Sequence, residues 1–205
     1  MSLPQKIIEL TTFDPILNLK MEQFYLEAGI PIILLWRSLP AVIIGRHQIR
    51  ENEIDEAAIA SHHIRVVRRI TGGGAIYMDL GNLNIGIISP TKVPRMPQWT
   101  VLFARILDQL GVAAESKRND ILVDGRKVSG WAETLLTGFS LAHGTLMFDV
   151  DLDMLSSVLL PPPEKLAGHG ITSIRQRVAN LKKYFPGWGM PEFISAIRTQ
   201  LHIRP

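Results

Sequence analysis

The sequence predicts an α+β domain in which helices flank a mostly antiparallel sheet. Short β-rich runs and helical stripes are interspersed without strict alternation, which disfavours a doubly wound parallel sheet. An Asp124-Gly125 pair between two such runs is typical of an antiparallel hairpin. The 205 residues, 46% of them hydrophobic and 20% charged, show neither repeats nor an internal linker, so we expect one domain over residues 1–205.

The first four expected elements are a strand, a helix and two further strands. Asp14 is a suitable N-cap for the helix, and Gly29 followed by Pro31 should end it. Two short apolar runs separated by a turn that contains a proline are expected to pair as a hairpin. The ranges are a strand at 6–10, a helix from Pro15 with a buried stripe of Leu17, Met21, Phe24 and Ala28, and strands at 32–36 and 41–45.

The rest of the chain mixes strands and helices less regularly. Asn52 is expected to cap a helix that runs to about Ser61, and a helix closed by Gly111 is expected to lie on the sheet. The remaining strands are expected at 64–67, 75–78, 83–89, 121–123, 126–129 and 143–150. The helix before Gly111 carries the stripe Trp99, Leu102, Phe103, Ile106 and Leu110, and further helices are expected at 152–159, 173–181 and 191–201.

Composition and charge exclude several classes of protein. With no Cys, the sequence excludes a disulfide framework, a thiolate metal site and a Cys nucleophile. The net charge of +3 is a mild excess that can attract an acidic partner or a polyphosphate, and with 7% aromatic residues it does not indicate nucleic-acid binding. No apolar stretch approaches the roughly 20 residues needed to span a bilayer, and no signal segment is visible, so a cytoplasmic location is expected.

A stretch of two arginines and three glycines is the most informative part of the sequence. Residues 68–74 read Arg-Arg-Ile-Thr-Gly-Gly-Gly between two expected strands. Consecutive glycines leave backbone amides accessible and permit positive φ, so the loop can approach an anion closely, and the arginines add positive charge. A flexible hairpin tip is the alternative. The loop matches neither the P-loop nor the dinucleotide-binding signature, so it would be a different kind of phosphate site.

Lys127 and His143 are two further candidate residues. Lys127 follows the predicted hairpin turn and, like Ser129, is expected to face inward, where it can neutralise charge on a phosphate or acyl oxygen. The alternatives are a solvated hairpin end for Lys127 and a core residue for His143, which lies in an apolar run. The adjacent histidines at 62–63 would face opposite sides of a strand, and three alternating aspartates lack the glycine and glutamate of a calcium loop, so neither group indicates a metal site.

Together these motifs resemble the lipoate-protein ligase A family, and the resemblance covers nearly the whole chain. It rests on residues 68–75, 79–82, 118–120, 127–130, 143–145, 170–175, 177–178 and 180–181, and upstream on 18–19, Glu22, 35–37 and 45–46. The resemblance implies the fold shared by class II aminoacyl-tRNA synthetases and biotin ligases. It also implies ATP-dependent activation of lipoate to lipoyl-AMP, followed by transfer of the lipoyl group to a lysine of an apo lipoyl domain.

The resemblance also implies a role for each matching residue, with Lys127 as the catalytic lysine. Lipoate or lipoyl-AMP is expected to contact Trp36, Arg69, Thr71, Gly72, Gly73, Gly74, Met78 and His143. The nucleotide is expected to contact Ala75, Asn82, Asn119, Asp120, Lys127, Gly144 and Thr145. Asp120 is further expected to bind Mg²⁺ through the phosphates, and no tightly bound metal is expected. The implied acceptors are the apo lipoyl domains of 2-oxoacid dehydrogenase E2 subunits and the glycine cleavage H protein, with neither nucleic acid nor a membrane as partner.

The sequence departs from the family pattern in three respects. Met78 stands where the family often has a histidine, and Ala142 stands first in the family's His-His-Gly-Thr run. The small C-terminal domain of many bacterial members is also absent, which favours either a truncated chain or one that needs a separate accessory protein for activation. A non-catalytic or transfer-only subunit that binds lipoyl-AMP is therefore the alternative function. Transferases that use a Cys thioester are excluded, and the G-R-G-R-x-G loop of biotin ligases is missing.

Overall fold

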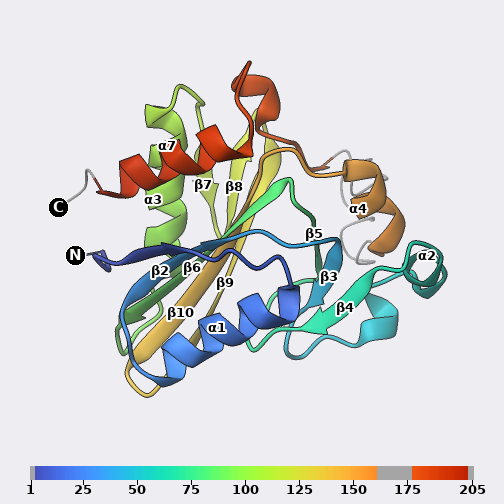
Figure 1. The fold of residues 1–205 in the computed structure, drawn as a ribbon, viewed down its shortest axis with the longest axis horizontal. Coiled ribbons are helices and arrows are strands. Elements are labelled where there is room, and N and C mark those ends of the chain that lie inside the picture. The colour runs from blue at the N-terminus through green and yellow to red at the C-terminus, as the bar shows by residue number, and fades with distance from the viewer. Residues whose placement is uncertain (1–2, 161–176, 203–205) are drawn as a thin grey trace.

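The computed structural model describes residues 3–160 and 177–202, and its main element is a seven-stranded sheet (Figure 1). Five of its strand pairings are antiparallel and the edge pair β1–β2 is parallel, which confirms the expected α+β class with a mostly antiparallel sheet. In spatial order the strands are β1 (Ile7–Glu9), β2 (Ile32–Trp36), β6 (Asn82–Pro90), β10 (Phe139–Met147), β9 (Arg126–Leu136), β8 (Asp120–Val123) and β7 (Glu115–Lys117).

A second, three-stranded sheet lies beside the first and corrects one prediction. It consists of β4 (Arg65–Arg68), β3 (Ala41–Ile44) and β5 (Ile76–Met78), with β3 in the middle. The predicted hairpin between residues 32–36 and 41–45 is therefore wrong, because β2 and β3 belong to different sheets. Every residue of both strands is buried, since each strand has a neighbour on either side and covered faces. The turn between them carries the chain from one sheet to the other.

Helices cover both faces of the large sheet (Figure 1). On one face, α3 (Met96–Gln109) and α7 (Met190–His202) enclose a core that includes Phe103, Trp131 and Phe193, which confirms the helix expected to end near Gly111. On the other face lies α1 (Pro15–Glu27). The short helices α2 (Glu56–Ser61) and α4 (Leu152–Val158) pack against the small sheet, and single 3-10 turns form at η1 (Arg50–Asn52) and η2 (Lys182–Tyr184).

Helix α1 begins where the sequence predicts but buries a different face. Asp14 caps it, with Oδ1 accepting from the amides of Ile16 at 2.8 Å and Leu17 at 3.2 Å. The apolar stripe expected to be buried is instead largely solvent-facing: Leu17 is 52% and Phe24 56% exposed. The buried face carries Pro15, Asn18, Glu22 and Leu26. Hydrophobic periodicity fails here because the polar side chains on the buried face have partners inside the protein, which offsets the cost of removing them from water.

Other element boundaries differ from prediction by a few residues. Asn52 closes the turn η1, whereas Asp55 is the cap of α2 and accepts from the amide of Ala58 at 2.9 Å. The strand expected at 143–150 runs from Phe139 to Met147. The helix expected at 173–181 is wrong over its last four residues, because Val178 forms a parallel bridge with Lys127. Its first residues, and the 170–175 motif, lie outside the described residues.

The predicted hairpin between β8 and β9 is confirmed and carries a bulge. Asp124 and Gly125 both have positive φ, at 50° and 71°, as a type I′ turn requires. Beyond the turn, Lys127 pairs with Leu122 and Ser129 pairs with Ile121, so Val128 is an extra residue without a cross-strand partner. Over residues 3–160 and 177–202, the structure contains no helix with the length and apolar character needed to cross a membrane.

Candidate active site

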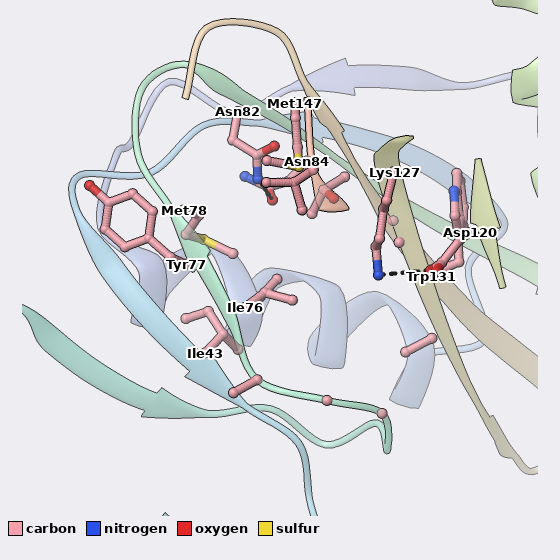
Figure 2. A pocket seen from close by; sticks show the side chains of 18 of the residues that line it. Ile43, Ile76, Tyr77, Met78, Asn82, Asn84, Asp120, Lys127, Trp131 and Met147 are labelled. Atoms are coloured by element: carbon pink, nitrogen blue, oxygen red, sulfur yellow. Dashed lines mark hydrogen bonds and ion pairs between the residues drawn. The ribbon is translucent and has the colours of Figure 1, made fainter. Parts of the chain in front are cut away.

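A cavity of about 620 Å³ lies between the two sheets and is lined in part by residues of α1 (Figure 2). This volume is within the range of roughly 300–1,000 Å³ that is usual for small-molecule sites. Most of the residues predicted from the sequence line it: Trp36, Arg69, Gly73, Gly74, Ala75, Met78, Asn82, Asn119, Asp120, Lys127, His143, Gly144 and Thr145. Thr71 and Gly72 do not line the cavity. Motifs spread over more than a hundred residues of sequence therefore meet at one place.

Lys127 projects from β9 into the cavity, as the sequence predicts, and is paired with Asp120 (Figure 2). The Lys127 Nζ atom lies 2.7 Å from Asp120 Oδ1, and the two side chains are 36% and 32% exposed. The lysine passes directly over Gly130, where a Cβ atom would lie 2.7 Å from Nζ. On its other side the backbone is fixed by Ala179, whose amide donates to the Lys127 carbonyl at 2.9 Å. The amine is thus positioned, yet remains accessible to a ligand.

The local reason for the direction of Lys127 differs from the one expected. The prediction rested on simple alternation, which would place Lys127 and Ser129 on the same face of β9. The bulge at Val128 interrupts that alternation. Ser129 is fully buried and accepts a hydrogen bond from Trp131 Nε1 at 2.9 Å, whereas Lys127 reaches the cavity. The bulge re-aims the lysine, which sequence alternation alone does not reveal.

Two asparagines of β6 place amide groups on the cavity wall. Asn82 Nδ2 donates to Asn84 Oδ1 at 3.3 Å, and Asn84 Nδ2 donates to the Trp36 carbonyl at 3.3 Å. The buried Asn82 Oδ1 has no partner within the described ranges. Because buried acceptors are normally bonded, this atom indicates a donor supplied by a ligand or water. Asn84 was missed by sequence reasoning, although alternation along the Asn82-Leu83-Asn84 run would have placed it beside Asn82.

The wall opposite the asparagines is apolar. Figure 2 shows Ile43 on β3 and Ile76 and Met78 on β5 along this wall, whereas Met147 of β10 lies beside its cross-strand partner Asn82. All four side chains line the cavity, as does Leu19 of α1. Lys127, Asp120 and Asn119 occupy the other end. The cavity therefore suits an elongated ligand with an apolar chain and an anionic head.

The two arginines before the triglycine loop (Gly72–Gly74) hold the backbone rather than face the cavity as free cations. Arg68 Nη1 donates to the carbonyls of Gly45 at 2.8 Å and Gln48 at 2.8 Å. Arg69, which is 6% exposed, donates from Nη2 to the carbonyls of Gly72 at 2.7 Å and Gly74 at 2.8 Å. The expectation that both arginines offer positive charge to an anion is therefore corrected, because backbone carbonyls already accept from them.

The triglycine loop itself retains the property expected of it. Gly73 has a φ of +89°, and its carbonyl packs so tightly against Gly45 that a Cβ atom there would lie 2.2 Å away. Within the described residues, the amides of the three glycines donate no hydrogen bond. Burial lowers the pKa of the Arg69 guanidinium to about 10, while nearby Glu22 acts in the opposite direction, so Arg69 is charged at neutral pH. The loop is thus held by Arg69, and Gly73 and Gly74 line the cavity with amides that have no acceptor among the described residues.

His143 belongs to a chain of hydrogen-bonded polar groups on the wall of the cavity. Its Nδ1 atom lies 2.8 Å from Glu22 Oε2, and its Nε2 atom lies 2.7 Å from Thr71 Oγ1. Glu22, which is 1% exposed, also accepts from Trp36 Nε1 at 2.9 Å. Neither interpretation made from the sequence anticipated this link between His143 and α1. The family resemblance includes Glu22 but assigns it no role, and hydrophobic periodicity does not distinguish it from the exposed Glu27 on the same helix.

Asp79 of the 79–82 motif lies outside the cavity and fixes the turn that enters β6. Its Oδ1 accepts from the amide of Gly81 at 2.8 Å, and its Oδ2 accepts from the amide of Asp151 at 2.9 Å. Burial raises the pKa of the Asp79 carboxyl, against the effect of these hydrogen bonds. The role of Asp79 is therefore to set the position at which Asn82 begins the strand.

Comparison with known proteins shows the family of this chain. A model of the lipoyl protein ligase A/B catalytic domain matches residues 14–202. Lipoate-protein ligase LplJ of Bacillus subtilis is 41% identical over 178 residues, which are 83% of this chain and 54% of that protein. The chain thus spans about half the length of the curated relatives it matches.

Solved structures show the same fold. A crystal structure of lipoate-protein ligase A bound with ATP superposes with a TM-score of 0.80 at 27% identity, covering 98% of this chain and 84% of that one. A bipartite lipoate protein ligase from Thermoplasma acidophilum, studied with its E2 lipoyl domain, gives 0.76 at 28% identity, covering 97% and 82%. The biotin protein ligase of Aquifex aeolicus, at 13% identity and a TM-score of 0.55 over 96% and 68%, shares the fold, which confirms the biotin ligase-like architecture.

Proposed function

Because the chain belongs to the lipoyl protein ligase A/B catalytic domain family, we propose that it activates lipoate with ATP and transfers the lipoyl group to a lysine of an apo lipoyl domain. The observation that supports this best is the cavity itself, which has an apolar wall at one end and the Lys127 amine at the other. Lipoate has two matching parts: an apolar chain for the wall and a carboxylate for the amine.

The first step would join two anions, and the cavity has the groups to offset their repulsion. A lipoate carboxylate oxygen forms a bond to the α-phosphorus of ATP, and the bond from that phosphorus to pyrophosphate breaks. Lys127 would stabilise the charge that develops at the carboxylate and phosphate oxygens. In the second step the acceptor amine bonds to the acyl carbon, AMP leaves with the electron pair of the broken bond, and the amine loses a proton.

The remaining predicted residues are assigned by their position along the cavity. We assign the acyl chain to the apolar wall with Trp36, Met78 and the loop Gly72–Gly74, and the nucleotide to Ala75, Asn82, Asn119, Asp120, Gly144 and Thr145. The Asp120 Oδ1 atom is buried and makes no hydrogen bond of good geometry, although it pairs with Lys127. A carboxylate with spare acceptor capacity fits Mg²⁺, which would bind here together with substrate phosphates and shield their charge.

A transfer-only subunit is the second candidate, and one observation favours keeping it. One structural neighbour is a bipartite lipoate protein ligase. In this alternative, the chain binds lipoyl-AMP and transfers the acyl group, while a separate accessory protein is required for activation. The proposed acceptors are the same in both cases: E2 subunits of 2-oxoacid dehydrogenases and the glycine cleavage H protein.

Two parallel incubations distinguish the candidates. The purified chain is mixed with an apo lipoyl domain and either lipoate with MgATP or preformed lipoyl-AMP, and the mass of the acceptor is measured. Modification in both supports the complete ligase. Modification only with lipoyl-AMP supports the transfer-only subunit, and modification in neither contradicts both proposals.

Lys127→Ala tests the residue on which the chemistry depends. We expect this variant to lose pyrophosphate release from ATP and lipoate while it keeps the wild-type circular dichroism spectrum. Lys20→Ala, an exposed lysine on the outer side of α1, is the matched control and should behave as wild type. Wild-type pyrophosphate release by Lys127→Ala would show that the lysine is not the catalytic group.

A further inference from the structure

Five side chains from α1, β2, β10 and the segment before the triglycine loop form one continuous chain of hydrogen bonds beside the cavity. Trp36 Nε1 lies 2.9 Å from Glu22 Oε1, and Glu22 Oε2 lies 2.8 Å from His143 Nδ1. His143 Nε2 lies 2.7 Å from Thr71 Oγ1, which lies 2.9 Å from Arg69 Nε. The chain thus connects one helix and two strands of the large sheet with the loop that carries the three glycines.

The two ends of this chain, with an ionised Glu22 and a neutral His143 between them, determine the direction of every hydrogen bond within it. The indole of Trp36 and the guanidinium of Arg69 can only donate. A carboxylate at Glu22 only accepts, so it takes one hydrogen from Trp36 and one from His143 Nδ1. A neutral His143 is then left with Nε2 as an acceptor. Thr71 accepts from Arg69 and gives its own hydroxyl hydrogen to His143, which satisfies every group.

The fold accommodates the buried Glu22 carboxylate by placing a glycine beneath it. Glu22 lies over Gly86 of β6, where a Cβ atom would be 2.6 Å from Glu22 Oε1. Gly86 is the cross-strand partner of His143, so the gap opens directly beside the imidazole. A carboxylate that is 1% exposed is costly to bury unless it is fully bonded. An apolar residue would fill this place on α1 more readily if packing were its only role.

We propose that Glu22 is a positioning residue that holds His143 as the Nδ1–H tautomer, so that His143 accepts from Thr71 and fixes the triglycine loop at the cavity. Glu22 lines the cavity, but both of its carboxylate oxygens are engaged by Trp36 and His143. It acts through His143 and Thr71 on a loop that is otherwise held by Arg69. The functional consequence rests on the proposed lipoylation, whereas the tautomer is a property of the protein alone.

Glu22→Gln tests the tautomer directly. The donor-only indole of Trp36 forces the glutamine to present its oxygen there, which places its NH₂ group against His143 Nδ1. His143 must then carry its hydrogen on Nε2. We expect ¹⁵N-histidine NMR at about pH 8, where an ordinary imidazole is neutral, to show Nδ1–H in the wild type and Nε2–H in Glu22→Gln. His143→Gln identifies the signal among the six histidines. An Nε2–H or doubly protonated ring in the wild type, or an unchanged ring in the variant, would overturn the proposal.

Kinetics test the link to the loop. For Glu22→Gln we expect KM for lipoate to rise about tenfold, as for the loss of one buried hydrogen bond to a charged group, with kcat within about twofold of wild type. Thr71→Val should raise KM equally while His143 stays Nδ1–H, and Thr71→Ser should restore a lower KM. Glu27→Gln makes the same change at an exposed site of α1 and is the control.

If Glu22→Gln does not fold, Thr71→Val still tests the proposal, because an unchanged KM for lipoate would refute the role of the loop contact. A wild-type His143 ring that is not the Nδ1–H tautomer contradicts this inference alone, whereas an inactive wild type contradicts the proposed function alone.

Discussion

At the scale of single residues, the site depends on positions where a side chain is absent. The ring of Trp131 packs flat on β10 because residue 144 is glycine: a Cβ atom there would lie 2.2 Å from the indole. Trp131 is part of the core under α3 and also lines the cavity. Gly144 therefore couples the packing of the core to the shape of the site, which a glycine in a predicted strand does not reveal by itself.

Gly144→Ala should destabilise the protein without altering any charged group. The added methyl overlaps an indole that is enclosed by core residues, so the ring or the strand must shift, and such overpacking costs about 1–3 kcal/mol. The unfolding midpoint in urea measures this loss. Gly74→Ala is the control, since a methyl group added at Gly74 would have no atom within 4 Å and the φ of this residue is not positive. Equal midpoints for Gly144→Ala and wild type would show that Trp131 is free to move.

Residues of the cavity wall that belong to short motifs were easier to predict than their supporting partners. Lys127, His143 and Asp120 line the cavity, as their motifs predict. Asn84 was not predicted, and Glu22 was named without its contacts, because those contacts involve distant elements. The hydrogen bonds of Arg69 to backbone carbonyls were not predicted, since its sequence neighbours suggest only an anion site. Local sequence reports residue types, whereas it does not report which buried acceptor a donor will meet.

At the scale of elements, the N-terminus of helix α3 is capped by a side chain from a strand. Arg95 precedes the helix and its side chain makes no capping bond. Instead Glu133 of β9 accepts from the amides of Arg95 and Met96, each at 2.9 Å. A carboxylate at a helix N-terminus satisfies free amides and also interacts favourably with the helix dipole. This contact fastens α3 to the sheet that carries Lys127.

Glu133→Ala should therefore destabilise the protein by about 1 kcal/mol, as for removal of a helix cap. Urea denaturation followed by circular dichroism is the measurement. Glu115→Ala, at an exposed position of β7, is the control. A midpoint for Glu133→Ala that matches Glu115→Ala would show that water replaces the carboxylate without loss.

Asp124 in the β8–β9 turn should make the stability of the protein depend on pH. Hydrogen bonds from the Tyr184 hydroxyl and then from Lys183 lower the pKa of the Asp124 carboxyl. The folded protein then binds fewer protons here than the unfolded chain, so this contribution is present above the ordinary carboxyl value and is lost as pH falls through the lowered value. Asp124→Asn keeps a residue that tolerates positive φ and removes the charge. We expect its urea midpoint to fall less than that of wild type between about pH 5 and pH 3. Parallel slopes would exclude this pair as a source of acid sensitivity.

The type of most elements was predicted correctly, whereas the pairing of β2 and β3 and the buried face of α1 were not. Helices α3 and α7, the hairpin turn and most strand ranges follow from periodicity and turn residues. The pairing of β2 with β3 failed because adjacency in sequence does not show that the chain changes sheets. The buried face of α1 failed because burial there follows hydrogen-bond partners rather than hydrophobicity.

At the scale of the whole molecule, the cavity lies where two sheets with separate cores meet. One core lies under α3 and α7, and another lies between the small sheet and helices α2 and α4. The cavity takes residues from both sheets, with Lys127 and Asn82 on the large sheet and Ile43 and Ile76 on the small one. A ligand that fills it would contact both sheets at once. The sequence predicted the class of fold but not this division, because no composition change marks it.

Ligand binding should therefore raise the thermal stability of the whole chain. A non-hydrolysable lipoyl-AMP analogue at about 100 times its Kd adds about 2.7 kcal/mol, which corresponds to a rise in Tm of about 5–10 °C for a chain of this size. Lipoate alone and AMP alone should each give a smaller shift, since each fills one end of the cavity. Differential scanning fluorimetry makes the measurement, with Lys127→Ala expected to lose much of the shift and Lys20→Ala to keep it. If AMP alone stabilised the chain as much as the analogue, the apolar wall would not be an acyl site.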